Sequence, residues 1–176
     1  MTADRMKVSG SDLPACRPVQ PDDACALGRL FERLQSQGVE KFFHPHPLTQ
    51  EAAEHRAAYA GKDVYCVLQM GTDLVGYGLL RGWDDGYDVP SLGLAIDASQ
   101  QGRGHGRRLM EFLHVLARQR GAKRIRLRVY PENVRALALY QSLGYAFNLK
   151  RGTDGQILGF LELIPENELP GKEQAR

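Results

Sequence analysis

The sequence predicts a single α/β domain in which helices flank one sheet of about six or seven strands. Three observations predict this fold class. The length, 176 residues, is ordinary for one domain with one core. Short apolar or alternating runs, typical of strands, are interspersed with longer patterns at helical spacing. A turn with three alternate glycines lies between the apolar run 92–96 and one of these helical patterns, as expected where a strand passes tightly into a helix.

The N-terminal part is predicted to contain one short strand and two helices. Residues 16–19 suit a strand, and Asp22 or Asp23 suits the N-cap of a helix. The buried face of this helix is expected to consist of Leu27, Leu30, Phe31 and Leu34. The two prolines of the segment 42–48 exclude a helix there. Thr49, with glutamates close behind, begins a second, short helix.

From residue 64 onward the pattern changes to strands with helices between some of them. Gly71-Thr72-Asp73 separates two apolar runs and predicts a hairpin. Apolar residues alternate with arginines over 124–129, which indicates a half-buried strand. Helical spacing predicts one helix that Gly121 ends and another over 133–142. The predicted strands of this part are residues 64–70, 74–80, 92–96, 124–129, 145–149 and 157–163.

The glycine-rich turn predicts an anion-binding site. Gly102, Gly104 and Gly106 lack a Cβ, so the backbone can curl with its N–H groups inward and let a ligand approach closely. The helix that starts there adds the positive end of its dipole and unpaired N–H groups, which favour a phosphate or pyrophosphate. The alternative is an ordinary strand-to-helix connection that uses glycine, but the neighbouring arginines favour the anion site.

A formal net charge of +2 hides a strongly basic segment. Between Arg103 and Arg128, nine lysines and arginines stand against one acid, Glu111, so this segment carries +8 and the remainder −6. Such an asymmetry indicates a polyanionic ligand or nucleic acid. For any single one of these residues, a solvated surface position is the simpler interpretation.

Composition excludes several classes of protein. Hydrophobic residues make up 43% and charged residues 25% of the chain, as in soluble globular proteins, and no apolar run approaches the roughly 18 residues that a membrane span needs. The first residues are charged and lack an apolar stretch, so no secretory signal is expected and a cytoplasmic localisation is favoured. The three cysteines show no C-x-x-C spacing, which suits free thiols, and no metal site is expected.

Two linked motifs resemble those of the GCN5-related N-acetyltransferase (GNAT) superfamily, whose members move an acetyl group from acetyl-coenzyme A (acetyl-CoA) to an amine. Gln101-Gly102-Arg103-Gly104-His105-Gly106 matches the first signature, R/Q-x-x-G-x-G/A. The second signature, N-x-x-A-x-x-x-Y-x-x-x-G-F/Y, is matched by Asn133, Ala136, Tyr140, Gly144 and Tyr145. The order of elements agrees from about residue 16 to residue 163, so the resemblance covers most of the chain.

The resemblance implies a mixed, mainly antiparallel sheet with an acetyl-CoA cleft where two adjacent parallel strands splay apart. Leu94 and Ile96 would hydrogen-bond the pantetheine arm through their backbone, and the amides from Gly102 to Arg107 would hold the pyrophosphate. The resemblance implies one N-acetyltransferase domain (14–165), while polar composition predicts a disordered leader (1–13) before it and a flexible tail (166–176) after it. The cofactor-binding residues that it implies are Leu94, Ala95, Ile96, Gln101, Gly102, Arg103, Gly104, His105, Gly106, Arg107, Asn133 and Ala136.

Tyr140 is the catalytic residue that the resemblance implies. It is similar in place to the family's tyrosine that serves the departing thiolate as general acid. A phenol with its ordinary pKa of about 10 stays protonated at neutral pH and can donate that proton. A packing role on an amphipathic helix is the alternative for Tyr140, and helix capping is the simpler role for Asn133.

The general base is not assigned. Many relatives place a glutamate on or near the strand that corresponds to residues 92–96, but this strand has no titratable side chain. The candidates are Asp84, Asp85, Asp88, His44 and His46. For each of them, a turn carboxylate or a solvated loop histidine is the simpler interpretation. A metal site at the two histidines lacks a third ligand at suitable spacing.

The resulting prediction is an enzyme that transfers an acetyl group from acetyl-CoA to a primary amine of a small molecule, such as an amino sugar, an amino acid or a polyamine. The amine is expected to attack directly in a ternary complex. The acceptor side is expected from the first two helices, their connection and the loop 81–88, where aromatics beside carboxylates suit a cationic amine.

Two alternatives from other classes stay open. One is a nucleic-acid-binding module that uses the basic segment 103–128, although nucleic acid is not the expected partner. The other is a catalytically inactive acyl-CoA sensor. The glycine spacing excludes a dinucleotide-binding domain, and the absence of G-K-S/T excludes a P-loop nucleotide triphosphatase. Members of the family often form dimers, so a homodimer is an open alternative for this protein.

Overall fold

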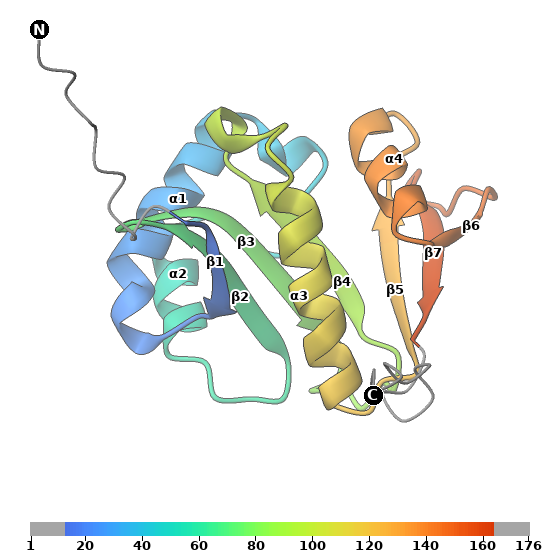
Figure 1. Cartoon of the computed structure of the whole chain (residues 1–176), viewed down its shortest axis with the longest axis horizontal. Coiled ribbons are helices and arrows are strands. Elements are labelled where there is room, and N and C mark those ends of the chain that lie inside the picture. The colour runs from blue at the N-terminus through green and yellow to red at the C-terminus, as the bar shows by residue number, and fades with distance from the viewer. Residues whose placement is uncertain (1–12, 164–176) are drawn as a thin grey trace, which may run out of the picture.

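The computed structural model describes residues 13–163. These residues form seven strands and four α-helices with short 3₁₀ turns between them (Figure 1). The strands are β1 (Ala15–Pro18), β2 (Val64–Met70), β3 (Asp73–Arg81), β4 (Ser91–Ile96), β5 (Arg124–Val129), β6 (Ala146–Asn148) and β7 (Ile157–Glu162). The helices are α1 (Ala24–Ser36), α2 (Gln50–Ala57), α3 (His105–Gln119) and α4 (Val134–Ser142).

All seven strands belong to one sheet with the order β1-β2-β3-β4-β5-β7-β6. Every neighbouring pair is antiparallel except β4 and β5, which are parallel. The predicted mixed, mainly antiparallel sheet is therefore confirmed. The parallel pair joins the two antiparallel parts of the sheet, and the chain crosses between them through α3.

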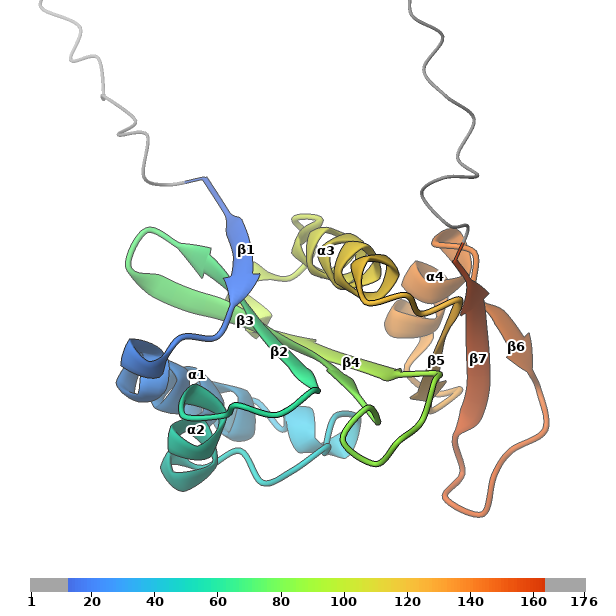
Figure 2. The ribbon, with the colours of Figure 1, turned by 90° about the horizontal axis from the view of Figure 1, so that it is seen from below.

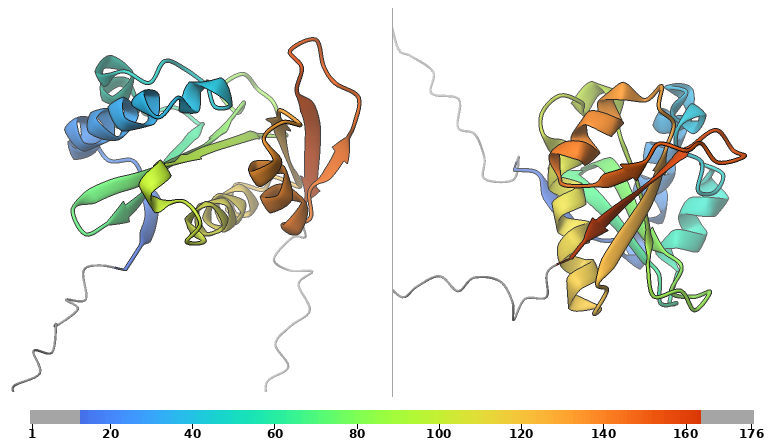
Figure 3. Two further views of the ribbon diagram at one scale, coloured as in Figure 1. Left: turned by 90° about the horizontal axis from the view of Figure 1, so that it is seen from above. Right: turned by 90° about the vertical axis from the view of Figure 1, so that its right-hand side faces the viewer.

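Helices cover both faces of the sheet. Figure 2 shows α1 and α2 on one face of the strands β1 to β4, and α3 on the other face with α4 beside it. The left view in Figure 3 shows the same arrangement, with helices on each of the two faces of the sheet. On the α1 side, Phe31 and Leu34 pack with Tyr77 of β3, and on the α3 side Leu109 and Leu113 pack with Ile125 of β5. Burial of each such side chain stabilises the fold by about 1.5–3 kcal/mol.

The observed elements follow the predicted ones with small shifts at their ends. The first strand lies one residue earlier than predicted, and α1 begins at Ala24 after a short 3₁₀ turn. Asp23 precedes α1, as predicted, but its carboxylate accepts from the Arg17 guanidinium at 2.6 and 2.7 Å and from the Gln20 N–H at 2.8 Å instead of capping α1. Thr49 caps α2 through Ala52 N–H.

The predicted leader, apart from Leu13, and the predicted tail lie outside the described residues. Within residues 13–163, no helix is both long and apolar enough to cross a bilayer.

Candidate functional site

β4 and β5 separate after a short contact, which leaves one edge of β4 unpaired. The two strands pair at one position, Ser91 with Arg126, and from there they diverge (Figure 1). The Asp97 N–H donates to Val75 O at 2.9 Å, and backbone groups along an antiparallel strand alternate in direction. It follows that Ala95 points its N–H and C=O toward β3, whereas Leu94 and Ile96 point theirs toward the gap beside β5.

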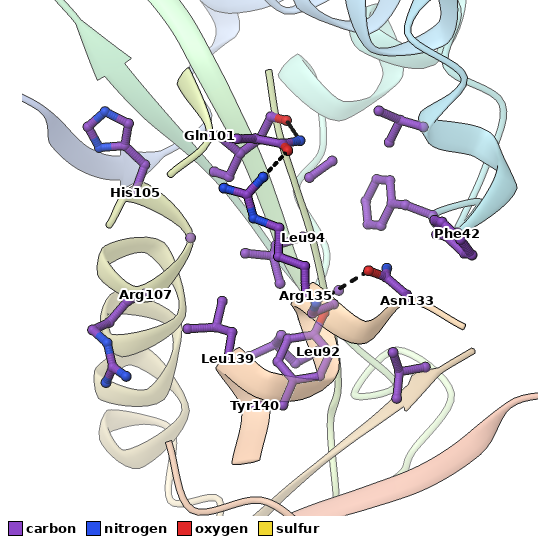
Figure 4. A pocket seen from close by; sticks show the side chains of 18 of the residues that line it. Phe42, Leu92, Leu94, Gln101, His105, Arg107, Asn133, Arg135, Leu139 and Tyr140 are labelled. Atoms are coloured by element: carbon purple, nitrogen blue, oxygen red, sulfur yellow. Dashed lines mark hydrogen bonds between the residues drawn. The ribbon is translucent and has the colours of Figure 1, made fainter. Parts of the chain in front are cut away.

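A cavity of about 550 Å³ occupies this gap (Figure 4). Its walls come from β4, the glycine-rich turn, the first turn of α3, α4, the end of β5 and the segment after α1. Of the thirteen site residues proposed from the sequence, Arg103 alone does not line it. The lining residues among them are Leu94, Ala95, Ile96, Gln101, Gly102, Gly104, His105, Gly106, Arg107, Asn133, Ala136 and Tyr140.

The glycine-rich turn places a row of free backbone donors at one end of the cavity. Gly102 and Gly104 adopt left-handed backbone angles, with φ of +79° and +78°, which glycine tolerates and other residues rarely adopt. Within residues 13–163, no acceptor takes a hydrogen bond from the N–H groups of residues 102–107. A Cβ added to Gly104 would meet nothing within 4 Å, so the space in front of these donors is open.

Asp97 holds the turn in place, and sequence reasoning did not single it out. Its carboxylate accepts from Arg33 at 2.7 Å and from Gln37 at 3.1 Å, both on or next to α1, and from Ser99 at the start of the turn. Burial by itself would raise the pKa of Asp97, but these hydrogen bonds outweigh it and lower the pKa to about 2. The carboxylate therefore stays charged and ties the turn to α1 across the sheet.

Arg135 also reaches the glycine-rich turn and was missed by sequence reasoning. Its guanidinium donates to Gln101 Oε1 at 2.8 Å, and Gln101 Nε2 donates to Ile96 O at 3.1 Å (Figure 4). Its Nη2 lies 3.4 Å from the position that a Cβ of Gly102 would take. A cation therefore stands beside the free amides. The signal that could have revealed it is its place in the first turn of α4, two residues after Asn133.

Three side chains of the turn and of α3 do not project into the cavity. Figure 4 shows His105 and Arg107 directed away from Leu94 and Tyr140. Arg107 donates to Ser142 Oγ at 2.6 Å and pairs with Glu111. Arg103 is exposed. Burial lowers the pKa of His105, and the nearby Arg103 and Arg108 add to the effect. These residues can offer the cavity their backbone, and not their charges.

α4 brings Tyr140 to the inner wall of the cavity. The Asn133 side chain caps α4 by accepting from Ala136 N–H at 3.3 Å, so the capping role of Asn133 is confirmed. Tyr140 is 9% exposed, and burial raises its pKa to about 12. Its hydroxyl makes no hydrogen bond with any residue from 13 to 163. Tyr140 is thus a protonated, free donor at neutral pH.

A family model described as "Acetyltransferase (GNAT) family" matches residues 29–145, which is more than half of the chain. This chain belongs to the GNAT acetyltransferase family. It is an N-acetyltransferase whose acetyl donor is acetyl-CoA. A search of curated protein sequences finds no match.

Solved structures show that the acetyltransferase shares its fold with other proteins of this kind. The GNAT domain of S. lividans PAT is similar with a TM-score of 0.72 and 21% identity, over 84% of this chain and 89% of that one. The ribosomal-protein-S18-alanine N-acetyltransferase of Escherichia coli is similar with a TM-score of 0.64 and 21% identity, over 93% and 100%. The yncA structure from Salmonella typhimurium, which contains acetyl-CoA as its cofactor, reaches 0.70 and 17%, over 90% and 98%.

The cavity residues of the acetyltransferase fit acetyl-CoA. Free N–H groups at a helix start, beside the open space at Gly104 and the cation of Arg135, suit linked phosphates. The unpaired edge of β4 suits an extended chain with amide groups. Within residues 13–163, no three His, Cys, Asp or Glu side chains gather in a way that could hold a metal ion.

A second cavity, of about 320 Å³, adjoins the first in the acetyltransferase. The two share Phe42, Phe43, Leu92, Gly93 and Arg128 in their walls. The loop 82–90 forms part of its wall, whereas the helices α1 and α2 do not. Asp63 shapes this loop by accepting from the N–H groups of Gly82, Trp83 and Asp84 at 2.8, 2.9 and 3.3 Å.

Two of the five candidates for the general base line this second cavity. They are His44, whose Nδ1 contacts Glu40 O at 3.1 Å, and Asp85. Asp84 instead binds the Tyr59 hydroxyl, which lowers its pKa, and also accepts from Lys62 N–H.

The remaining two candidates do not line either cavity. His46 contacts the Tyr77 hydroxyl at 2.9 Å and Pro47 O at 2.8 Å, so both its ring nitrogens are engaged, and burial lowers its pKa. Asp88 lies exposed in the loop.

Proposed function

We propose that the acetyltransferase moves the acetyl group of acetyl-CoA to a primary amine of a small molecule, by direct attack of the amine while both substrates are bound. The observation that carries this proposal is the meeting of three features in one cavity: the unpaired edge of β4, the free amides of the glycine-rich turn and the protonated hydroxyl of Tyr140. The adjoining cavity supplies room for the acceptor.

The proposed cofactor contacts are mainly backbone contacts. Leu94 and Ile96 offer N–H groups, and Leu94 a free C=O, on the edge of β4 that faces the cavity, because the C=O of Ile96 already accepts from Gln101. The amides of residues 102–107 would hold the pyrophosphate at the positive end of the α3 dipole. Arg135 would add a charge-assisted contact to the same phosphates.

Tyr140 is proposed as the general acid. Acetyl-CoA, when bound, supplies a thioester whose sulfur leaves as a thiolate. The Tyr140 hydroxyl has no partner among residues 13–163 that would hold its proton, and its raised pKa keeps that proton in place at neutral pH. The Tyr140 hydroxyl can hydrogen-bond the sulfur as negative charge develops on it, and it can supply the proton that turns the departing thiolate into a thiol with an ordinary pKa of about 8.5.

The positive charges of the basic segment 103–128 are explained without a nucleic-acid partner. Several of its cations are paired with acids, such as Arg107 with Glu111, Arg124 with Glu162 and Arg128 with Asp154. The remaining cations of residues 103–128 are divided between both faces of the sheet, because Arg126 faces the second cavity and Arg108 lies on α3. Such a division does not form one continuous surface for a duplex.

The test is release of free thiol from acetyl-CoA in the presence of single primary amines. We expect thiol release above the rate without amine for at least one amino sugar, amino acid or polyamine, and a matching acetylated product by mass spectrometry. A peptide that begins with alanine should be included, because the similar Escherichia coli enzyme acetylates ribosomal protein S18 at alanine. Acetylation of this peptide, with all small amines inert, would replace the small-molecule acceptor by a protein N-terminus.

A further inference from the structure

The second cavity contains two arginines that pair with no acid in the described part of the chain. Arg81 and Arg126 line this cavity and are half-buried. Arg81 donates one hydrogen bond, to Pro45 O at 2.7 Å. The Arg126 guanidinium stands over the Tyr87 ring at 5.4 Å. Among residues 13–163, neither has a carboxylate within ion-pair distance, whereas Arg128 at the cavity wall pairs with Asp154 at 2.7 Å.

Half-buried charges without a counter-ion are costly, so this pair calls for an explanation. A guanidinium carries five N–H donors in a planar fork that matches the oxygens of a carboxylate or phosphate. Within residues 13–163, Arg81 uses one of these donors in a hydrogen bond and Arg126 uses none. The single acid in the cavity wall is Asp85, and it forms no ion pair with either arginine within the described part of the chain. The cavity is therefore cationic overall.

The two arginines lie on one face of the sheet at the point where the two substrate cavities meet. Arg126 is paired with Ser91 at the last contact between β4 and β5, and Arg81 faces the same residue from β3. The Phe43 side chain lies against Gly93 on that face, since a Cβ at Gly93 would come 3.1 Å from its ring. An anion held by these arginines would leave the other end of a small molecule free to point along β4 toward Tyr140.

We propose that the acceptor is a small primary amine that carries its own anionic group, a carboxylate or a phosphate, and that Arg81 and Arg126 bind this group. The proposal rests on the proposed function and names its substrate class. It replaces the expectation of a cationic amine held by loop carboxylates. Asp84 is taken up by Tyr59 and Lys62, and the Trp83 ring stacks on Arg120 at 5.2 Å instead of lining the cavity.

The experiment compares pairs of amines that differ in the anionic group. The pairs are phenylalanine with phenethylamine, alanine with ethylamine, and glucosamine 6-phosphate with glucosamine. In thiol release from acetyl-CoA, we expect the anionic member of at least one pair to have a kcat/KM about ten- to a hundredfold higher, as charge-assisted hydrogen bonds of this kind provide. The amino acid pairs and the sugar pair tell a carboxylate from a phosphate.

Arg126→Gln and Arg81→Gln should remove this preference while the KM for acetyl-CoA stays within about twofold. Arg124→Gln is the matched control. Arg124 lies on the same face of β5, pairs with Glu162 at 2.5 Å and does not line either cavity. This control variant should keep both the preference and the turnover.

The outcomes separate this inference from the proposed function. If the amine without an anionic group reacts as fast as the anionic amine or faster, the inference is wrong and the proposed function still holds. The same follows if the preference for the anionic amine is unchanged in both Arg126→Gln and Arg81→Gln. Transfer to peptide alone overturns the inference as well. If no amine reacts, calorimetry with coenzyme A and each anionic amine decides: binding lost in Arg126→Gln supports the anion site, and absence of binding overturns it.

Discussion

At the scale of single residues, the site of this acetyltransferase depends on where burial and hydrogen bonding leave a proton. Burial raises the pKa of Tyr140 to about 12 and leaves its hydroxyl without a partner among residues 13–163. The opposite happens at Asp97, where three hydrogen-bonding side chains outweigh burial and lower the pKa to about 2. Tyr140 thus keeps its proton at neutral pH, and Asp97 keeps the charge that fixes the glycine-rich turn.

Tyr140→Phe tests the proposed general acid. The substitution keeps the ring and its packing but removes the proton, so turnover should fall by about a hundredfold or more, while coenzyme A affinity by calorimetry changes by less than about twofold. Tyr145→Phe is the control: Tyr145 lies next to Tyr140, with ring centroids 6.0 Å apart, but outside the cavity. Unchanged turnover in Tyr140→Phe would remove the acid role.

At the scale of elements, the site is a junction between a strand, a turn and a helix. The edge of β4, the amides of the glycine-rich turn and the first turn of α3 act together because each supplies backbone donors that nothing else uses. The turn is held from α1 by Arg33 and from α4 by Arg135, so two helices on opposite faces of the sheet fix one loop.

Gly104→Asp tests the anion cradle. The carboxylate would enter the open space in front of the free amides and repel the phosphates, so coenzyme A affinity should fall by about a hundredfold or more. Gly121→Asp is closely matched, because Gly121 has the same φ of +78° and nothing within 4 Å of its Cβ position, and it does not line the cavity. Both variants carry the same backbone cost, so equal loss of coenzyme A binding, measured by calorimetry, would contradict the cradle.

At the scale of the whole molecule, one buried histidine links α3 to the C-terminal part of the sheet. His114 Nε2 and the Tyr145 hydroxyl lie 2.9 Å apart, and His114 is 5% exposed. Burial lowers the pKa of His114 to about 4, and Arg118 adds to the effect. The folded protein therefore keeps this ring neutral where the unfolded chain, with its ordinary pKa of 6.5, would bind a proton.

This difference predicts a loss of stability in weak acid. The neutral His114 ring makes its full contribution to the free energy of unfolding above pH 6.5. This contribution declines as the pH falls toward 4, because the unfolded state takes up a proton that the folded state does not. Urea denaturation at pH 7 and pH 4.5 should show a loss of about 2–3 kcal/mol from this group. In His114→Gln the loss of stability between pH 7 and pH 4.5 should be smaller by about 2–3 kcal/mol. His55 lies at an exposed position of α2, so His55→Gln should show the same loss as the unmodified protein. An identical pH dependence in all three proteins would rule out the buried histidine as its cause.

The sequence by itself determined the family, the order of elements and most of the residues that line the cavity beside β4. Gly102 and Gly104 precede a helix, and Asn133 and Tyr140 follow at the spacing of the second motif. These residues specify the conformation of the turn and the start of α4, because backbone angles and helix starts are local properties. The tertiary structure alone decided which charges face the second cavity. Arg81 and Arg126 are 45 positions apart, and Asp84 and Asp85 are neighbours with different surroundings. Sheet order and packing determine such contacts, and a pattern of residues along the chain does not record them.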